Sequence, residues 1–231
     1  MRATSIIYRR ELGTYLRSPY GWVIAALLLL IFGLFFQGWA MRGEMLSAFV
    51  LERYFYVASG IPLFAGVLLS FRLLSEERQN HSMVLLNTSP VRDSEIVIGK
   101  FLAALTFLAV ILLLSVYMPI LIKVNGKVTT AQVVVGYFGM LLLGAATLAV
   151  GLFASALTRQ QLIAAVVAAA LVVVMCFIHL LGGAVDPPLK DVLEQIDLWW
   201  VHYQYGFMKG ILNLKDVIYY VAATYFFLLL S

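Results

Sequence analysis

The sequence predicts an all-α, polytopic membrane protein with six transmembrane helices, an N-terminal interfacial helix and an external amphipathic helix pair. Five stretches close to the length of a bilayer span contain no charged residue: 22–39, 54–71, 101–122, 131–157 and 162–181. A helix needs about 20 mainly apolar residues to cross the hydrocarbon core. The composition agrees, since 63% of the residues are hydrophobic and only 12% are charged, against about 25% charged in soluble domains.

The composition also limits the chemistry that we expect from this chain. The net charge of +4 is not gathered in an aromatic-rich patch, so we interpret it as membrane topology and expect no nucleic-acid partner. The sequence has one cysteine, Cys176, no phosphate-binding loop and no His-Glu-x-x-His or Cys-x-x-Cys motif. No span has Asp, Glu, Lys or Arg near its middle, and His179 is read as an interfacial residue. We therefore expect no catalytic, cofactor or metal site, and active transport would need energy from a partner.

Residues 4–17 are predicted to form an amphipathic helix that lies in the headgroup plane before the first span. Its apolar face has Tyr8, Leu12, Tyr15 and Leu16 at helical spacing, and its other side has Arg2, Arg10 and Arg17. Ser18 and Pro19 end this helix, which favours a separate element over an extension of the first span.

We place the spans at about 21–41, 55–74, 96–122, 131–157, 162–181 and 215–231. Pro62 and Pro119 should kink the second and third spans. The last span is short and reaches Ser231 without a polar tail, so we expect the natural chain to continue. Lys and Arg are denser on the side of the N-terminus, which predicts that the N-terminus is inside.

Small residues mark the expected helix contacts, because they let backbones approach closely in lipid. The fourth span has a stripe of Gly144, Thr147, Gly151 and Ala154, which we interpret as packing within one bundle. The first, second and fifth spans are our candidates for a dimer face, from Gly33, Gly60, Gly66 and the alanines at 164, 165, 168 and 169.

The segment 182–214 between the fifth and sixth spans is predicted to contain an amphipathic helix on the external face. After two prolines, its apolar positions are Leu189, Val192, Leu193, Ile196, Trp199 and Trp200, and its opposite side has Lys190, Asp191, Glu194 and Asp197. Tryptophans prefer the depth of the membrane interface. The run 202–205 that follows could line an exit path or belong to an ordinary aromatic belt.

The segment 72–100 is the longest one expected on the inner side. It contains four consecutive apolar residues, Met83, Val84, Leu85 and Leu86, inside a charged loop. Such a run needs a partner groove, although a short helix resting on the membrane surface is the alternative. Ser89 and Pro90 break this helix, and Asp93 or Ser94 is expected to cap the third span.

Several segments resemble the permease subunits of type-2 ATP-binding-cassette (ABC) exporters, most closely the gliding-motility-associated permease GldF. In the loop these are Ser75-Glu76-Glu77-Arg78, Leu85-Leu86-Asn87-Thr88-Ser89-Pro90 and Gly99-Lys100-Phe101. Residues 141–146, 151–155 and 210–216 are also similar to that family, so the resemblance covers nearly the whole chain.

The resemblance implies one permease domain over residues 1–231, with three working segments. The loop 75–95 would dock on a separate ATPase through Glu76, Glu77, Arg78, Met83, Val84, Leu85, Leu86, Asn87 and Thr88. The helix 4–17 would be a connector acting through Tyr8, Arg9, Arg10, Leu12 and Arg17. The segment 182–214 would be an external gate with Leu193, Ile196, Trp199, Trp200, His202, Tyr203 and Tyr205.

The implied complex has two permease halves, identical or related, and two copies of a cytoplasmic ABC ATPase that carries ATP and Mg. The chain itself would be a non-enzymatic exporter half in the bacterial inner membrane, in contact with the lipid bilayer, and a periplasmic accessory protein is a further candidate partner. The alternative is a non-transporting mechanical or scaffold subunit of an ATPase-driven envelope or motility complex.

Overall fold

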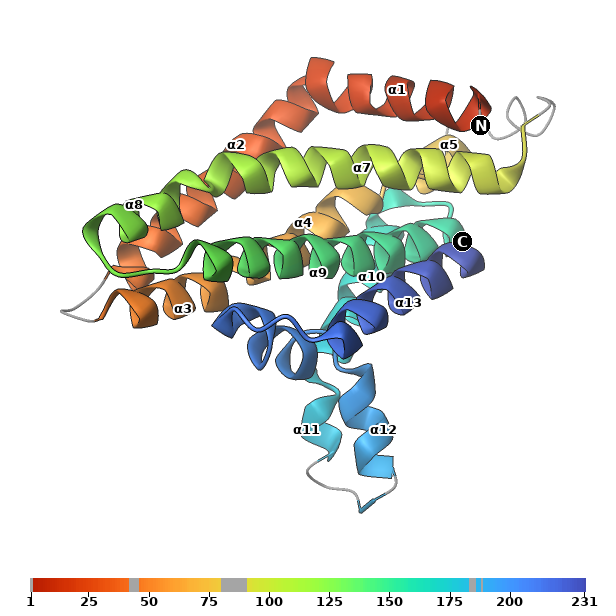
Figure 1. The fold of residues 1–231 in the computed structure, drawn as a ribbon. Helices are drawn as coiled ribbons and strands as arrows, with labels where there is room; N and C mark the ends of the chain where they lie inside the picture. Colours follow the sequence, from red (N-terminus) through yellow and green to blue (C-terminus); the bar gives the residue numbers. More distant parts are fainter. Residues whose placement is uncertain (1, 42–45, 80–90, 183–185, 188) are drawn as a thin grey trace.

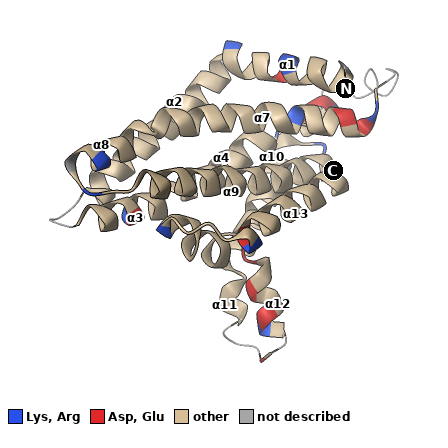
Figure 2. Cartoon of the chain, viewed as in Figure 1, with Lys and Arg blue, Asp and Glu red and all other residues tan. Residues whose placement is uncertain are grey.

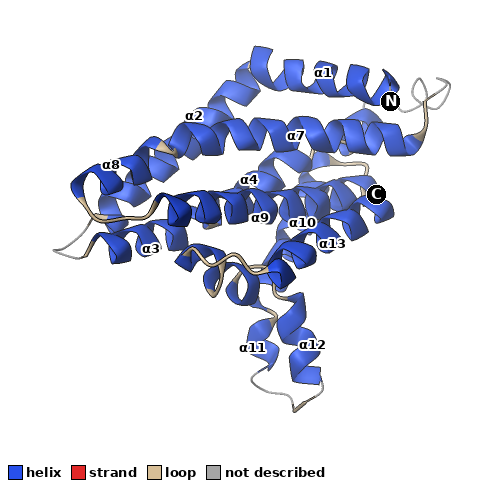
Figure 3. Cartoon of the chain, viewed as in Figure 1, coloured by secondary structure: helices blue, strands red, loops and turns tan. Residues whose placement is uncertain are grey.

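The computed structural model describes residues 2–41, 46–79, 91–182, 186–187 and 189–231, and within these ranges the chain is helical, without strands (Figure 3). The main helices are α1 (Arg2–Arg17), α2 (Pro19–Phe35), α3 (Ser47–Ala58), α4 (Gly60–Ser70), α5 (Ser75–Gln79), α7 (Asp93–Ser115), α8 (Tyr117–Asn125), α9 (Thr130–Leu157), α10 (Gln161–Phe177), α11 (His179–Gly182), α12 (Leu189–Ile196) and α13 (Leu214–Leu230). Short η elements cover Phe36–Ala40, Trp200–Gln204 and Phe207–Lys209.

The long helices form one bundle around α9, which contacts α4, α7, α10 and α13 (Figure 1). Charged residues gather toward the helix ends and connections, and the middle of the bundle is apolar (Figure 2). Five helical stretches are long and apolar enough to cross a membrane: 19–40, 47–79, 93–124, 130–157 and 161–182. The first five predicted spans are therefore confirmed as helices, and the sixth corresponds to α13, which has 17 residues.

Two of these stretches are interrupted close to a proline. The second breaks at Ser59, three residues before Pro62, and the third breaks at Val116, three residues before Pro119. A proline lacks the N–H that would bond to the carbonyl four residues earlier, and its ring clashes with that carbonyl. The predicted kinks are thus confirmed as helix breaks.

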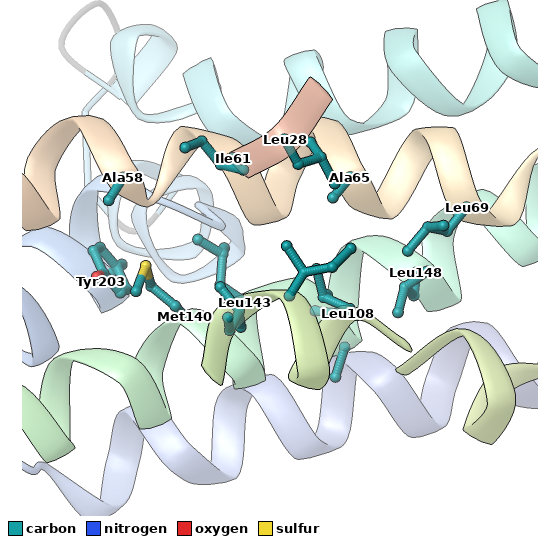
Figure 4. Close-up of a cluster of buried hydrophobic side chains, with 14 of the residues drawn as sticks. Leu28, Ala58, Ile61, Ala65, Leu69, Leu108, Met140, Leu143, Leu148 and Tyr203 are labelled. Atoms are coloured by element: carbon teal, nitrogen blue, oxygen red, sulfur yellow. The ribbon is translucent and has the colours of Figure 1, made fainter. Parts of the chain in front are cut away.

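The core of the bundle is the contact between α4 and α9 (Figure 4). A Cβ added to Gly66 would collide with the side chain of Thr147 and lie 3.1 Å from the backbone nitrogen of Leu148. One added to Gly151 would collide with the Ser70 hydroxyl. The small-residue stripe of the fourth span therefore packs inside one bundle, as predicted.

The same contacts correct part of the predicted dimer face. Gly66 is buried against α9, and Ala164 and Ala168 on α10 are fully buried. These small residues make contacts within the chain, because they lie where α4 and α10 meet other helices. Gly60 alone of the predicted second-span glycines faces open space.

The helix α1, for which the sequence predicts a place in the headgroup plane, packs along the first half of α7 (Figure 1). Ile7 and Tyr15 are buried in this contact, whereas Leu16, assigned to the apolar face, is 45% exposed. Gly21 permits the sharp corner into α2, since a Cβ there would collide with the Tyr15 carbonyl. The apolar face of α1 is therefore used largely for contact with the bundle.

We expect Gly66→Ala to destabilise the protein by about 1–3 kcal/mol, the usual cost of overpacking a close contact. Gly60→Ala is the matched control on the same helix, because no atom lies within 4 Å of the added Cβ. Thermal unfolding in mild detergent, followed by size-exclusion chromatography, should show a lower midpoint for Gly66→Ala only. Equal midpoints for the two variants would contradict the close α4–α9 contact.

Candidate functional site

A largely buried group of four charges joins three helices close to the point in the chain where residues 80–90 begin. This ionic cluster consists of Arg10 and Glu11 on α1, Glu77 on α5 and Lys100 on α7. The Lys100 ammonium lies 3.1 Å from a Glu11 carboxylate oxygen and 3.0 Å from one of Glu77. The Arg10 guanidinium reaches the same two oxygens at 2.9 and 3.2 Å. Each cation thus bridges both carboxylates.

The cluster is shielded from solvent except at Arg10. The side chain of Lys100 is 3% exposed and that of Glu77 is 12% exposed. Burial alone would raise the pKa of Glu11, but the neighbouring Lys100 and Arg10 outweigh burial and lower it. A buried charge without its partner is costly, so the three helices are held together as long as Lys100, Glu11 and Glu77 keep their contacts.

Close backbone packing brings α1 to this position. A Cβ at Gly99 would lie 2.9 Å from the Ile7 side chain and 3.2 Å from the Thr4 carbonyl oxygen, so only glycine allows this approach. Further along, the Tyr8 hydroxyl donates to Thr106 at 3.3 Å. Lys100, the next residue after Gly99, is therefore set against Glu11.

The turn that leads into α5 is held on the end of α9. The Ser155 hydroxyl accepts hydrogen bonds from the backbone N–H groups of Leu74 and Ser75, at 3.0 and 2.9 Å, and donates to the Phe71 carbonyl at 2.9 Å. Arg78 donates to the Ala156 carbonyl. The short helix before the loop 80–90 is thus connected to α9 as well as to α1 and α7.

A second charged pair lies on the other side of this turn. Arg72 pairs with Glu76 at 2.8 Å, and its guanidinium lies 4.3 Å from the centre of the Tyr20 ring. The hydroxyls of Tyr15 and Tyr20 donate to the carbonyls of Leu69 and Leu68, both at 2.9 Å. These contacts anchor the corner between α1 and α2 to the end of α4.

The structure describes only some of the residues predicted to couple to the ATPase or to form the connector. Glu76, Glu77 and Arg78 each make the contacts given above, and Arg10 belongs to the ionic cluster. Arg9 and Arg17 are exposed on the outer face of α1. The predicted docking residues 83–88 lie outside the described residues.

Three residues of this site are not predicted from the sequence: Glu11, Lys100 as a bridging group, and Ser155. Glu11 lies on the same helical face as Tyr8 and Tyr15, and a charge on an apolar face was the available signal. The expected cap of α7 also differs, because the backbone N–H of Arg92 donates to the Glu95 carboxylate.

The predicted gate segment contains a different polar network. The helix α12 ends at Ile196, and α11 and α12 pack together and project from the bundle (Figure 1). Asp197, expected on the solvated side, is fully buried: it accepts from the backbone of Trp199 at 2.9 Å and contacts His179 at 2.7 Å. It caps the turn after α12, so Trp199 and Trp200 do not continue that helix.

His202 and Tyr203 are also buried, so neither lines an open path within this chain. The two ring nitrogens of His202 face a carboxylate oxygen of Asp216 at 2.8 Å and the Gln195 carbonyl at 3.2 Å. Leu193, Trp199 and Trp200 are half-buried, whereas Ile196 and Tyr205 are exposed.

A family model described as ABC-2 family transporter protein matches residues 5–229. The chain belongs to the ABC-2 transporter family. No curated protein matches it. As a member of this family it is a multi-pass membrane protein and a transmembrane permease component of an ABC transporter. Of the segments that carry the resemblance to such permeases, 75–78, 99–101 and 151–155 meet at the ionic cluster and the adjoining turn.

We expect Lys100→Met to destabilise the ABC-2 permease by about 3–5 kcal/mol, because two buried carboxylates then lose their main partner. Arg10→Met should cost less than about 1 kcal/mol, since the Arg10 side chain is 58% exposed. Thermal unfolding in detergent measures both, and adding Glu11→Gln to Lys100→Met should restore part of the loss. A Lys100→Met midpoint equal to that of Arg10→Met would show that the cluster is not a structural tie.

Proposed function

We propose that this chain is one permease half of an ATP-driven exporter, most similar to the GldF-like permeases, and that it couples to a separate cytoplasmic ABC ATPase. ATP and Mg would bind to the ATPase, and two permease halves, identical or related, would work with two ATPase copies. The family supports the permease role. The observation that carries the coupling role is the ionic cluster directly before the loop 80–90.

The geometry explains how force on that loop would reach the bundle. Glu77 and Arg78 connect α5 to α1, α7 and α9. Because separating Glu77 from Lys100 would strand buried charges, α5 and the two helices that it meets there should move as one unit. An ATPase that pulls on residues 80–90 would thereby move α1 and the start of α7.

The proposed topology has six spans, with α13 as the sixth, and both termini in the cytoplasm of a bacterial cell. The ionic cluster, the loop 80–90 and the end of α9 would then face the ATPase. The connection between α8 and α9 would face the outside.

Cysteine labelling tests this topology. In a Cys176→Ser background, Arg159→Cys should react with a membrane-impermeant maleimide only after the membrane is opened, and Lys127→Cys should react in intact spheroplasts. Both positions are exposed, so accessibility does not bias the comparison. Labelling of Arg159→Cys from outside would overturn the orientation and the coupling proposal with it.

We expect Leu85→Asp combined with Leu86→Asp to leave membrane insertion intact but to abolish recruitment of the ATPase. Full burial of one such side chain contributes about 1.5–3 kcal/mol, so losing two anchors should weaken docking by a few kcal/mol. Co-purification and ATPase activity are the measurements. Ile211→Asp with Leu212→Asp, an exposed apolar pair in the segment before α13, is the control and should still recruit the ATPase.

The second candidate function is a mechanical or scaffold subunit that uses the same ATPase without moving a substrate. The projecting helices α11 and α12 favour it, because Leu180, Leu189 and Val192 are all more than half exposed and could hold an accessory protein. Transport assays on the reconstituted complex, with and without a partner on residues 182–214, separate the two functions.

A further inference from the structure

An apolar groove runs along the outer side of α2, α3 and α4. The part between α2 and α4 has a volume of about 550 Å³ and is lined by Leu28, Phe35, Val57, Gly60, Phe64 and Trp199, among others. This volume is in the usual range for a small-molecule site. The groove is open along its length and lies between helices that cross the membrane, so lipid can reach it from the side.

The chemistry of the groove changes toward the start of α3. Tyr56 is shared with a second hollow of about 590 Å³, where Glu52 and Arg53 join Phe49 and Met208. Glu52 and Met208 in turn border a third, smaller hollow that has Gln132 and Lys209 in its wall. Among the described residues, the path thus begins apolar and ends at two cations, Arg53 and Lys209, and one acid, Glu52.

The residues around the groove do not suit a second helix. Helices associate in lipid through small residues; Gly66 and Gly151 are used between α4 and α9, and Gly60 is, among the described residues, the one small residue that lines the part of the groove between α2 and α4. The outer faces of α2 and α4 instead present large side chains, among them Leu27, Leu30, Leu34 and Phe64, all more than 40% exposed. These side chains suit contact with acyl chains.

We propose that this groove binds an anionic amphiphile, with its acyl chain along α2 and α4 and its headgroup at Arg53 and Lys209. The apolar part of the groove suits the acyl chain, and the guanidinium of Arg53 and the ammonium of Lys209 at its mouth are donors suited to an anionic headgroup. In the orientation proposed above the mouth faces the outer leaflet, so the groove is where an exported amphiphile would leave. That role rests on the proposed function, whereas binding itself does not.

Trp199, in the wall of the groove, provides the measurement. The chain has four tryptophans, and replacing Trp22, Trp39 and Trp200 with Phe leaves Trp199 as the only one. The protein is reconstituted without ATPase in bilayers that contain phosphatidylglycerol or phosphatidylcholine with brominated chains. Bromine quenches the fluorescence of a tryptophan in contact with it. The dependence of this quenching on the fraction of brominated lipid gives the relative affinity of the groove for the two lipids.

We expect stronger quenching by phosphatidylglycerol than by phosphatidylcholine. Arg53→Gln and Lys209→Gln should each reduce that preference by about fivefold, the effect of about 1 kcal/mol per cation near an anionic headgroup. Lys123→Gln, which removes an exposed cation that does not line the groove, should leave it unchanged.

Gly60→Leu tests the apolar part, because Gly60 lines the groove and no atom lies within 4 Å of an added Cβ. It should fill the groove and abolish most of the quenching. Gly38→Leu is the matched control, since Gly38 also has open space and is outside the groove. Native mass spectrometry of the chain with its natural tryptophans, with and without Gly60→Leu, provides a second readout of retained lipid.

Equal quenching by both lipids would overturn the anionic site, and unchanged quenching in Gly60→Leu would overturn the groove as the binding place. Absence of any quenching would show that another protein surface, such as a second copy, covers the groove. Because no ATPase is present, each of these failures leaves the coupling proposal untouched, and loss of ATPase recruitment in the Leu85→Asp, Leu86→Asp variant leaves the groove untouched.

Discussion

The close contact between α4 and α9 is the constraint on which the rest of the bundle depends. In lipid, apolar surface alone does not drive two helices together, so they associate where small residues allow backbone approach. Gly66 and Gly151 provide that approach, and Thr147 and Ser70 occupy the space opposite them. Because α9 also contacts α7, α10 and α13, moving it relative to α4 would disturb most of the core.

The charged end of the bundle is built on this contact. Ser155 follows Gly151 by one helical turn and binds the backbone where α5 begins. That attachment sets the position of Glu77, and α1 completes the arrangement by packing closely on α7 at Gly99. A buried ionic group is a weak source of stability but a strong tie between its parts, because breaking it leaves charges unpaired. Such a tie would suit the transmission of motion that we propose for this region.

Away from the ionic cluster, a break in the second helical stretch is hydrogen-bonded to the turn after α12. The second span breaks at Ser59, and the hydroxyl of this residue accepts a hydrogen bond from the Trp199 indole at 2.8 Å. Trp199 follows Asp197, which is buried and bonded to His179. A change in the angle between α3 and α4 would therefore reach both the outer groove and the segment 197–204.

The sequence by itself determined the five long membrane helices, the two proline breaks and the small-residue stripe of α9, because length, hydropathy and local backbone chemistry act along the chain. It also identified Glu77 and Arg78 as functional candidates through a family resemblance. Only the tertiary structure decided that α1 lies on α7, that Glu11 and Lys100 complete the ionic cluster, and that Asp197 and His202 are buried. These features depend on which faces meet across distant segments, and a charge at a helix end looks the same in sequence whether it faces water or a buried partner.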